Sequence, residues 1–200
     1  PAPDDPRGAG FGSMVMPVFM AGAALGIALT QMVRRAAPIA VLLPVGAFLI
    51  GATTVGVATW IGVLSGGFWL PWLALSVGIL AISAAIAGMV SVVGLAGMGV
   101  AVMLFMLIGM PLAGISSPPE FLPGIWGDVG QWLPLGATGT ALRSATFFGG
   151  AGSAAAYAAL GLWIAIGYLL LGASVVKRRK MVDEALDQST SEGKAVPAVA

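Results

Sequence analysis

The chain has 200 residues, of which 58% are hydrophobic and only 8% are charged, and its mean hydropathy is +1.00. Soluble domains carry about 25% charged residues, so this composition excludes an ordinary water-soluble globule. The net charge of +1 gives no reason to expect nucleic acid as a partner. The chain has no Cys and no His, which removes thiolate metal sites, the commonest metal ligand and the commonest general base. We therefore expect no catalytic residue, no cofactor and no metal.

Two long stretches of the sequence contain no charged side chain. Residues 36–119 and residues 144–176 have neither Asp, Glu, Lys nor Arg. A helix crosses the hydrocarbon core of a bilayer in about 20 residues, so the first stretch is long enough for several crossings. The pattern predicts an all-α protein, an integral membrane helical bundle.

The breaks between apolar segments predict the number of crossings. The first segment stops at Arg34 and Arg35, and Pro38 opens the second. Residues 72–115 would be about 66 Å long as one helix, which is twice the hydrocarbon thickness. We therefore divide them into two spans at a glycine-containing turn, where a positive φ costs little. The prediction is five spans, at about residues 14–33, 38–63, 72–92, 96–115 and 154–176.

Basic residues at the ends of the spans predict the orientation. In a five-span arrangement they all fall on one side of the membrane, and they are Arg34, Arg35, Lys177, Arg178, Arg179 and Lys180. The positive-inside rule assigns that side to the cytoplasm of a plasma-membrane protein, so the start of the chain would lie outside. Tryptophans favour membrane interfaces, and five of them fall near the predicted outer one: Trp60, Trp69, Trp72, Trp126 and Trp132.

The two ends of the chain differ from the apolar middle. Residues 1–13 contain prolines, glycines and charges, and we expect them to tether the membrane domain to a larger part of the protein outside the membrane. We accordingly expect this chain to be the C-terminal part of a longer protein. Residues 177–200 are mostly polar and predict a basic stop followed by a disordered cytoplasmic tail.

The segment 116–153 is too apolar for a solvated loop and too interrupted for a plain span. Prolines and Glu120 can start a helix, and apolar residues then recur at helical spacing as far as Leu133. Gly124, Gly127, Asp128 and Gln131 would occupy the opposite face. Pro134 ends this helix, and a second would run over 135–148. We expect two short interfacial or re-entrant helices on the outer side.

These two helices are the candidate functional site. Two interpretations stay open: a cap that packs on the bundle, or an outer gate over a substrate path. Arg143 is correspondingly either an interfacial anchor, paired with Asp128, Glu120 or a lipid phosphate, or a substrate contact. The candidate residues of the cap or gate are Pro119, Glu120, Leu122, Pro123, Trp126, Asp128, Trp132, Pro134 and Arg143.

Small residues at a spacing of four predict close contacts between helices. Gly22 and Gly26 form one such pair, and Gly62 and Gly66 form another. They indicate either packing within the bundle or the seam of a homodimer.

Four short runs in the second half of the chain resemble a known family. They are Gly109-Met110-Pro111, the stretch from Ser117 to Pro123, Gln131-Trp132-Leu133-Pro134 and Ala141-Leu142-Arg143. Together they resemble the end of a type-2 ABC exporter permease, and most closely the YhgE/Pip-like membrane proteins of Gram-positive bacteria. The resemblance implies that this chain covers the last five of six spans, with two short re-entrant helices between the last two.

The predicted spans also limit the function. None of them contains an ionisable side chain, which argues against a proton-coupled carrier. There is no phosphate-binding loop motif, so the chain is not expected to be an enzyme, and ATP hydrolysis would need a separate ATPase subunit. With the resemblance, we expect a permease-like subunit of an ABC-type exporter that moves an amphipathic or lipid-like envelope substrate. The alternative is a structural or receptor membrane anchor for a large extracellular domain. The expected partners are the lipid bilayer, a second copy or paired permease, and the ATPase.

Overall fold

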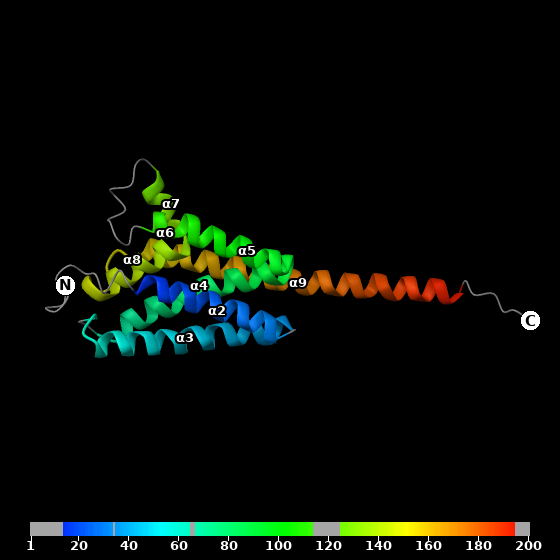
Figure 1. Ribbon diagram of the computed structural model, residues 1–200, viewed down its shortest axis with the longest axis horizontal. Helices are drawn as coiled ribbons and strands as arrows, with labels where there is room; N and C mark the ends of the chain where they lie inside the picture. The colour runs from blue at the N-terminus through cyan, green and yellow to red at the C-terminus, as the bar shows by residue number, and fades with distance from the viewer. Residues whose placement is uncertain (1–13, 34, 65–66, 114–124, 195–200) are drawn as a thin grey trace, which may run out of the picture.

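The computed structural model describes residues 14–33, 35–64, 67–113 and 125–194. Within these ranges every regular element is helical, so the predicted all-α architecture is confirmed. The elements are α2 (Val15–Met32), α3 (Ala36–Trp60), α4 (Trp69–Val93), α5 (Leu95–Met103), the π-helix η1 (Leu104–Gly109), α6 (Met110–Leu112), α7 (Trp126–Trp132), α8 (Pro134–Phe147) and α9 (Ala154–Lys194). Figure 1 shows them gathered in one elongated bundle, from which α9 projects.

Four of these helices are long and apolar enough to cross a membrane. They are α2, α3, α4 and the stretch Ala154–Gln188 of α9, and they coincide with four of the predicted spans. The fifth predicted span, 96–115, corresponds to a shorter apolar helix, Ala96–Leu112, which includes the π-helical turn. As a regular helix it would be about 26 Å long, slightly less than the hydrocarbon core. A count of five crossings therefore stays a prediction.

Helix α4 is the centre of the bundle. It packs against α2, α3, α5, α8 and α9, and its residues 81–88 are buried without interruption. Most of this stretch is alanine, serine or glycine, and such small side chains allow neighbouring helices to approach on every side. The other long helices are apolar too, so it is the small side chains of α4, and not its hydrophobicity, that suit it to the centre.

The first glycine pair is used for packing within the bundle. A Cβ on Gly22 would lie 3.0 Å from the Ile82 side chain, and one on Gly26 would lie 2.6 Å from the Ser83 carbonyl oxygen, so this face of α2 rests directly on α4. The second pair does not form a helix seam. Gly62 follows the end of α3 with a φ of 77°, and Gly66 lies outside the described residues. A left-handed backbone ends a helix, which the spacing alone could not indicate.

The outward faces of the long helices are apolar as well. Large side chains stay exposed there, among them Val41, Leu49, Val57, Leu162 and Leu169. Water would penalise so much exposed hydrocarbon, whereas acyl chains solvate it. Four apolar helices with apolar outward faces are those of a membrane protein.

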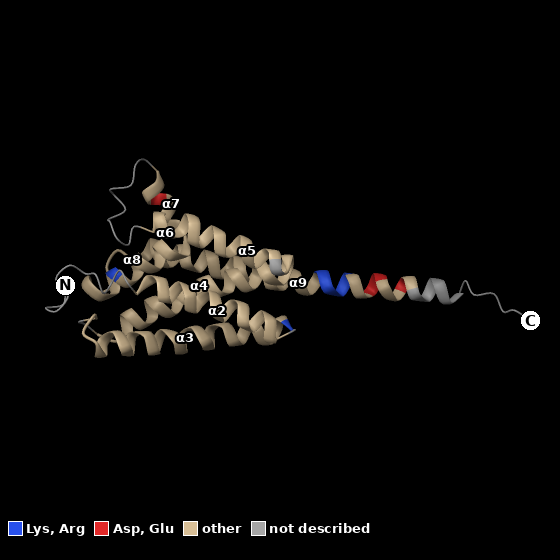
Figure 2. Ribbon diagram, viewed as in Figure 1, with Lys and Arg blue, Asp and Glu red and all other residues tan. Residues whose placement is uncertain are grey.

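Apart from Arg143 on α8, the described basic residues lie at the end of the bundle opposite the interfacial tryptophans. Figure 2 shows basic residues at the turn between α2 and α3 and along α9 beyond the bundle, and Arg35, Arg178 and Arg179 line one pocket. The end of α3, the start of α4 and α7, which carry the interfacial tryptophans, lie at the other end (Figure 1). Arg34 is outside the described residues. Which end faces the cytoplasm stays a prediction.

The C-terminal region differs from the expectation of a disordered tail after residue 176. Helix α9 continues to Lys194 and is about 61 Å long, so it extends well beyond the bundle. The sequence of this extension is rich in good helix formers, and Arg179 and Lys180 stand four residues before Asp183 and Glu184. The polar composition that predicted disorder is equally compatible with a solvated helix. Residues 1–13, the predicted tether, and residues 195–200 lie outside the described part.

We predict that a cysteine at Ala151 reacts with an impermeant thiol reagent in intact cells, whereas one at Ala185 reacts only after permeabilisation. Both positions are exposed, and the chain has no other cysteine. Ala151 lies in the turn between α8 and α9, and Ala185 lies on the α9 extension beyond the basic cluster. Labelling of position 185 in intact cells would mean that the orientation in the membrane is opposite to the predicted one.

Candidate functional site

The predicted cap consists of two helices that meet at Pro134. Helix α7 contacts α6 and α8, and α8 begins at Pro134 directly after α7 ends. Leu133, between them, has an extended backbone with φ −80° and ψ 148°. Proline forces the preceding residue out of the helical region but is itself compatible with a first helical turn. The break predicted at this proline is therefore confirmed.

Helix α7 packs through its glycines rather than through its apolar face. Gly127 and Gly130 are buried, while Ile125, Trp126 and Trp132 are at least half exposed. Gly130 lies so close to the Leu112 carbonyl oxygen that a Cβ there would overlap it. Of the face predicted to lie opposite the apolar positions, Asp128 is exposed and Gly127 is buried, because the missing side chains of the glycines let α7 approach α6 with its backbone.

Gln131 joins the two cap helices to each other and to the end of α6. Its Nε2 donates a hydrogen bond to the Ala113 carbonyl oxygen after α6, at 3.3 Å. Its Oε1 accepts a hydrogen bond from the Thr140 hydroxyl of α8. In a membrane protein such side-chain bonds hold helices together where hydrophobic burial contributes little. The amide thus fixes α7 relative to both neighbours.

Helix α8 is buried inside the bundle and does not lie flat on it. Leu135 and Leu142 are almost fully buried, and the helix packs on α4 and α9. Gly78 of α4 lies directly against the side chain of Thr138, whose hydroxyl donates to the Pro134 carbonyl oxygen at 2.5 Å. Of the two arrangements expected for this segment, interfacial or re-entrant, this packing resembles the re-entrant one.

Trp163 of α9 ties the cap to the long helices. Its Nε1 donates to the Trp132 carbonyl oxygen at 2.8 Å, which lies at the end of α7. Its ring meets that of Phe105 edge-to-face, with the centroids 5.2 Å apart. Sequence reasoning did not place Trp163 in the site. Its position in the middle of a predicted span could have indicated this contact, because an indole N–H inside a membrane needs a hydrogen-bond acceptor.

The structure places five of the predicted cap residues. Trp126, Asp128 and Trp132 are exposed on α7, Pro134 is buried at the start of α8, and Arg143 is half-buried in the second half of α8. The other four lie outside the described residues: Pro119, Glu120, Leu122 and Pro123. The described cap residues thus belong to two neighbouring helices, and no metal-ligating cluster occurs in the described part of the chain.

The Gln131 bridge gives a testable prediction. Gln131→Leu leaves the Ala113 carbonyl and the Thr140 hydroxyl without their partner, and we expect the free energy of unfolding to fall by about 1–3 kcal/mol. Thr140→Val removes only one of the two bonds and should cost less. Thermal unfolding in detergent, followed by tryptophan fluorescence, measures both variants. Equal stability of Gln131→Leu and the wild type would contradict the role of the bridge.

Comparisons with known proteins identify no relative, because no family model, no curated protein and no solved structure matches the chain.

Proposed function

We propose that the chain is a permease-like subunit of an exporter that moves an amphipathic or lipid-like substrate, powered by a separate ATPase. The observation that carries the proposal is the chemistry of the interior. Among the described residues, every buried polar side chain is a hydroxyl, and the six are Ser76, Ser83, Thr138, Ser144, Ser153 and Ser174. A charged substrate inside a bilayer would need fixed countercharges, whereas an amphiphile needs only apolar walls and weak polar contacts.

The cap supports the same proposal. Helices α7 and α8 lie at the end that the positive-inside rule assigns to the outside, and α8 reaches into the bundle beside α4 and α9. Under this proposal, a movement of α8 relative to α4 and α9 opens or closes the substrate path. Under this proposal Arg143, half-buried in α8, contacts the polar part of the substrate.

The experiment combines capture and transport. The tagged full-length protein should retain an ATPase subunit in mild detergent, and inverted vesicles should move a fluorescent phosphatidylethanolamine probe, which has no net charge, only with ATP. We expect Arg143→Ala to lower this rate about tenfold, which corresponds to one lost charge-assisted hydrogen bond. Arg143→Lys is the matched control and should retain part of the rate. Unfolding temperature is measured in parallel, since an effect on folding alone would lower it.

The absence of both an ATPase subunit and ATP-dependent lipid movement would overturn the proposal. A well-folded Arg143→Ala variant with full transport would overturn only the substrate contact of Arg143 and would leave this residue as an interfacial anchor.

A second candidate function is a membrane anchor for a domain outside the membrane. The close contacts of α4 favour it, because Gly26 and Gly88 bring backbones of neighbouring helices together and make the bundle stiff. The two functions differ in their need for these particular spans. An unrelated multi-span anchor in place of residues 14–176 would preserve the function of an anchor and abolish that of a permease.

A further inference from the structure

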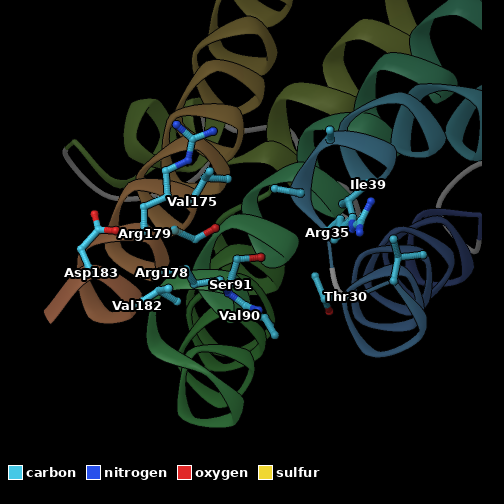
Figure 3. A pocket seen from close by; sticks show the side chains of 14 residues that line it. Thr30, Arg35, Ile39, Val90, Ser91, Val175, Arg178, Arg179, Val182 and Asp183 are labelled. Carbon is cyan, nitrogen blue, oxygen red and sulfur yellow. The ribbon is translucent and has the colours of Figure 1, made fainter. Parts of the chain in front are cut away.

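A pocket of about 530 Å³ lies at the basic end of the bundle, away from the cap. Its walls come from three places: the turn between α2 and α3, the C-terminal end of α4, and α9 where it leaves the bundle. Figure 3 shows Arg178 reaching from α9 toward Val90 and Ser91 of α4, with Arg35 opposite, beside Ile39. The pocket therefore exists only because segments far apart in the sequence meet here.

The pocket has a strong excess of positive charge. Arg35, Arg178 and Arg179 line it, against a single acidic residue, Asp183. Two hydroxyls on the wall are already engaged, because Thr30 and Ser174 donate to carbonyl oxygens of their own helices at 2.8 and 2.6 Å. The guanidinium groups are thus the main donors that a ligand would meet. Their planar forks match the oxygens of a phosphate group.

The other lining side chains of the pocket are largely aliphatic. Val33, Ile39, Val90 and Val175 contribute to its wall, and Arg178 follows the charge-free stretch 144–176 almost directly. The arginines therefore stand where an apolar span gives way to a polar extension, which is the depth of lipid headgroups. A ligand seated here has its anionic group among guanidinium groups and its hydrocarbon against valine and isoleucine.

We propose that this pocket binds one anionic phospholipid, with the phosphate held by Arg35 and Arg178 and the upper part of an acyl chain against Ile39 and Val90. The proposal goes beyond the exporter function, since the lipid would bind whether or not the chain transports anything. Basic pockets between membrane helices at the cytoplasmic side attract anionic headgroups, and each basic residue near such a surface contributes about 1 kcal/mol. Removing one arginine should thus weaken binding roughly fivefold.

The test measures lipid binding to the delipidated, detergent-solubilised full chain by native mass spectrometry. The probes are dioleoyl-phosphatidylglycerol and, as the uncharged comparison, dioleoyl-phosphatidylcholine. We expect at least a tenfold preference for phosphatidylglycerol. Arg178→Gln should weaken its binding roughly fivefold and the double variant Arg35→Gln/Arg178→Gln roughly 25-fold, whereas Arg178→Lys, which keeps the charge but not the planar fork, should lose less than Arg178→Gln.

The matched control is Lys180→Gln, which removes the same charge from the same helix at an exposed position that does not line the pocket. It should leave the affinity for phosphatidylglycerol within twofold of the wild type. If Lys180→Gln weakened binding as much as Arg178→Gln, the binding would depend on diffuse surface charge and not on the pocket, and the proposal would be overturned.

A competition experiment distinguishes binding of a whole lipid from binding of a free anion. Glycerol phosphate carries the headgroup chemistry without acyl chains, and it should fail to displace the lipid at concentrations a hundred times higher. Val90→Gln should weaken phosphatidylglycerol binding and leave any glycerol phosphate binding unchanged. Effective competition by glycerol phosphate, or equal binding of the two phospholipids, overturns the assignment. Arg178→Lys keeps the positive charge on a somewhat shorter side chain, so binding intermediate between the wild type and Arg178→Gln shows that the loss in Arg178→Gln reflects charge and not misfolding.

Discussion

Gly167→Ala should lower the free energy of unfolding by about 3 kcal/mol, the upper range for an overpacked interior. Gly167 lies on α9 where that helix crosses α4, and a Cβ there would overlap the backbone of Ala84. Backbone atoms cannot move aside as a flexible side chain can, so the two helices must separate along their contact. This contact is the most extensive one between described elements, which makes the effect large.

The crossing of α4 and α9 offers a second glycine for the same test, on α4, and a control glycine on α9. A Cβ on Gly88 of α4 would lie 2.6 Å from the Gly167 carbonyl oxygen, so Gly88→Ala should also destabilise the protein. Gly172, on the same α9 helix, has open space around its Cβ position. Because alanine favours a helix over glycine by about 1 kcal/mol, Gly172→Ala should be neutral or slightly stabilising.

Thermal and dodecyl-sulfate unfolding, followed by tryptophan fluorescence, compare the three variants with the wild type. If Gly167→Ala and Gly172→Ala unfold alike, α4 and α9 do not pack through Gly167.

The second large effect is expected for Gly130→Ala in the cap, at about 2–3 kcal/mol. The Cβ would overlap the Leu112 carbonyl oxygen, and a Cβ on Gly136 of α8 would in turn overlap the Gly130 carbonyl oxygen, so α7 is tightly packed on both neighbours here. Separating α7 from α6 would also break the hydrogen bond between Gln131 and Ala113. We therefore expect the cap to loosen while the long helices remain assembled.

Limited proteolysis in detergent distinguishes local loosening from global unfolding, because cleavage reports how often a segment opens. Gly130→Ala should raise cleavage within the cap severalfold and leave cleavage at the connection between α2 and α3 unchanged. Gly99→Ala on α5 is the control, since its Cβ would meet open space. Cap cleavage that is unchanged by Gly130→Ala, or raised equally by Gly99→Ala, would contradict the packing described for α7. If the cap also gates transport, Gly130→Ala should lower the transport rate.

Local features of the sequence predicted local features of the fold. The turn between the third and fourth predicted spans falls at Gly94, whose φ of 77° is the conformation for which a glycine was expected there. The break before α8 falls at Pro134, as the chemistry of proline requires. Each of these depends on one residue and its immediate neighbours, so no knowledge of the rest of the chain was needed.

The orientation of α7 could not be predicted in the same way. Its apolar spacing identified one face of the helix, but the side that packs on the bundle carries Gly127 and Gly130. Glycine has no side chain and so contributes nothing to a hydrophobic pattern. It matters for packing only where another backbone, here that of Leu112, comes close. The helical extension of α9 was missed for a related reason, because a polar composition is shared by disordered segments and solvated helices.

The sequence by itself determined that this is a helical membrane protein, where most of its apolar helices begin and end, and that its basic residues gather at the ends of those helices. Composition and breaks along the chain carry that information. Only the tertiary structure decided that α4 is central, that α8 is buried, and that Arg35 and Arg178 share a pocket. Faces that meet lipid and faces that meet another helix are equally apolar in a membrane, so no hydrophobic period along the chain tells one from the other.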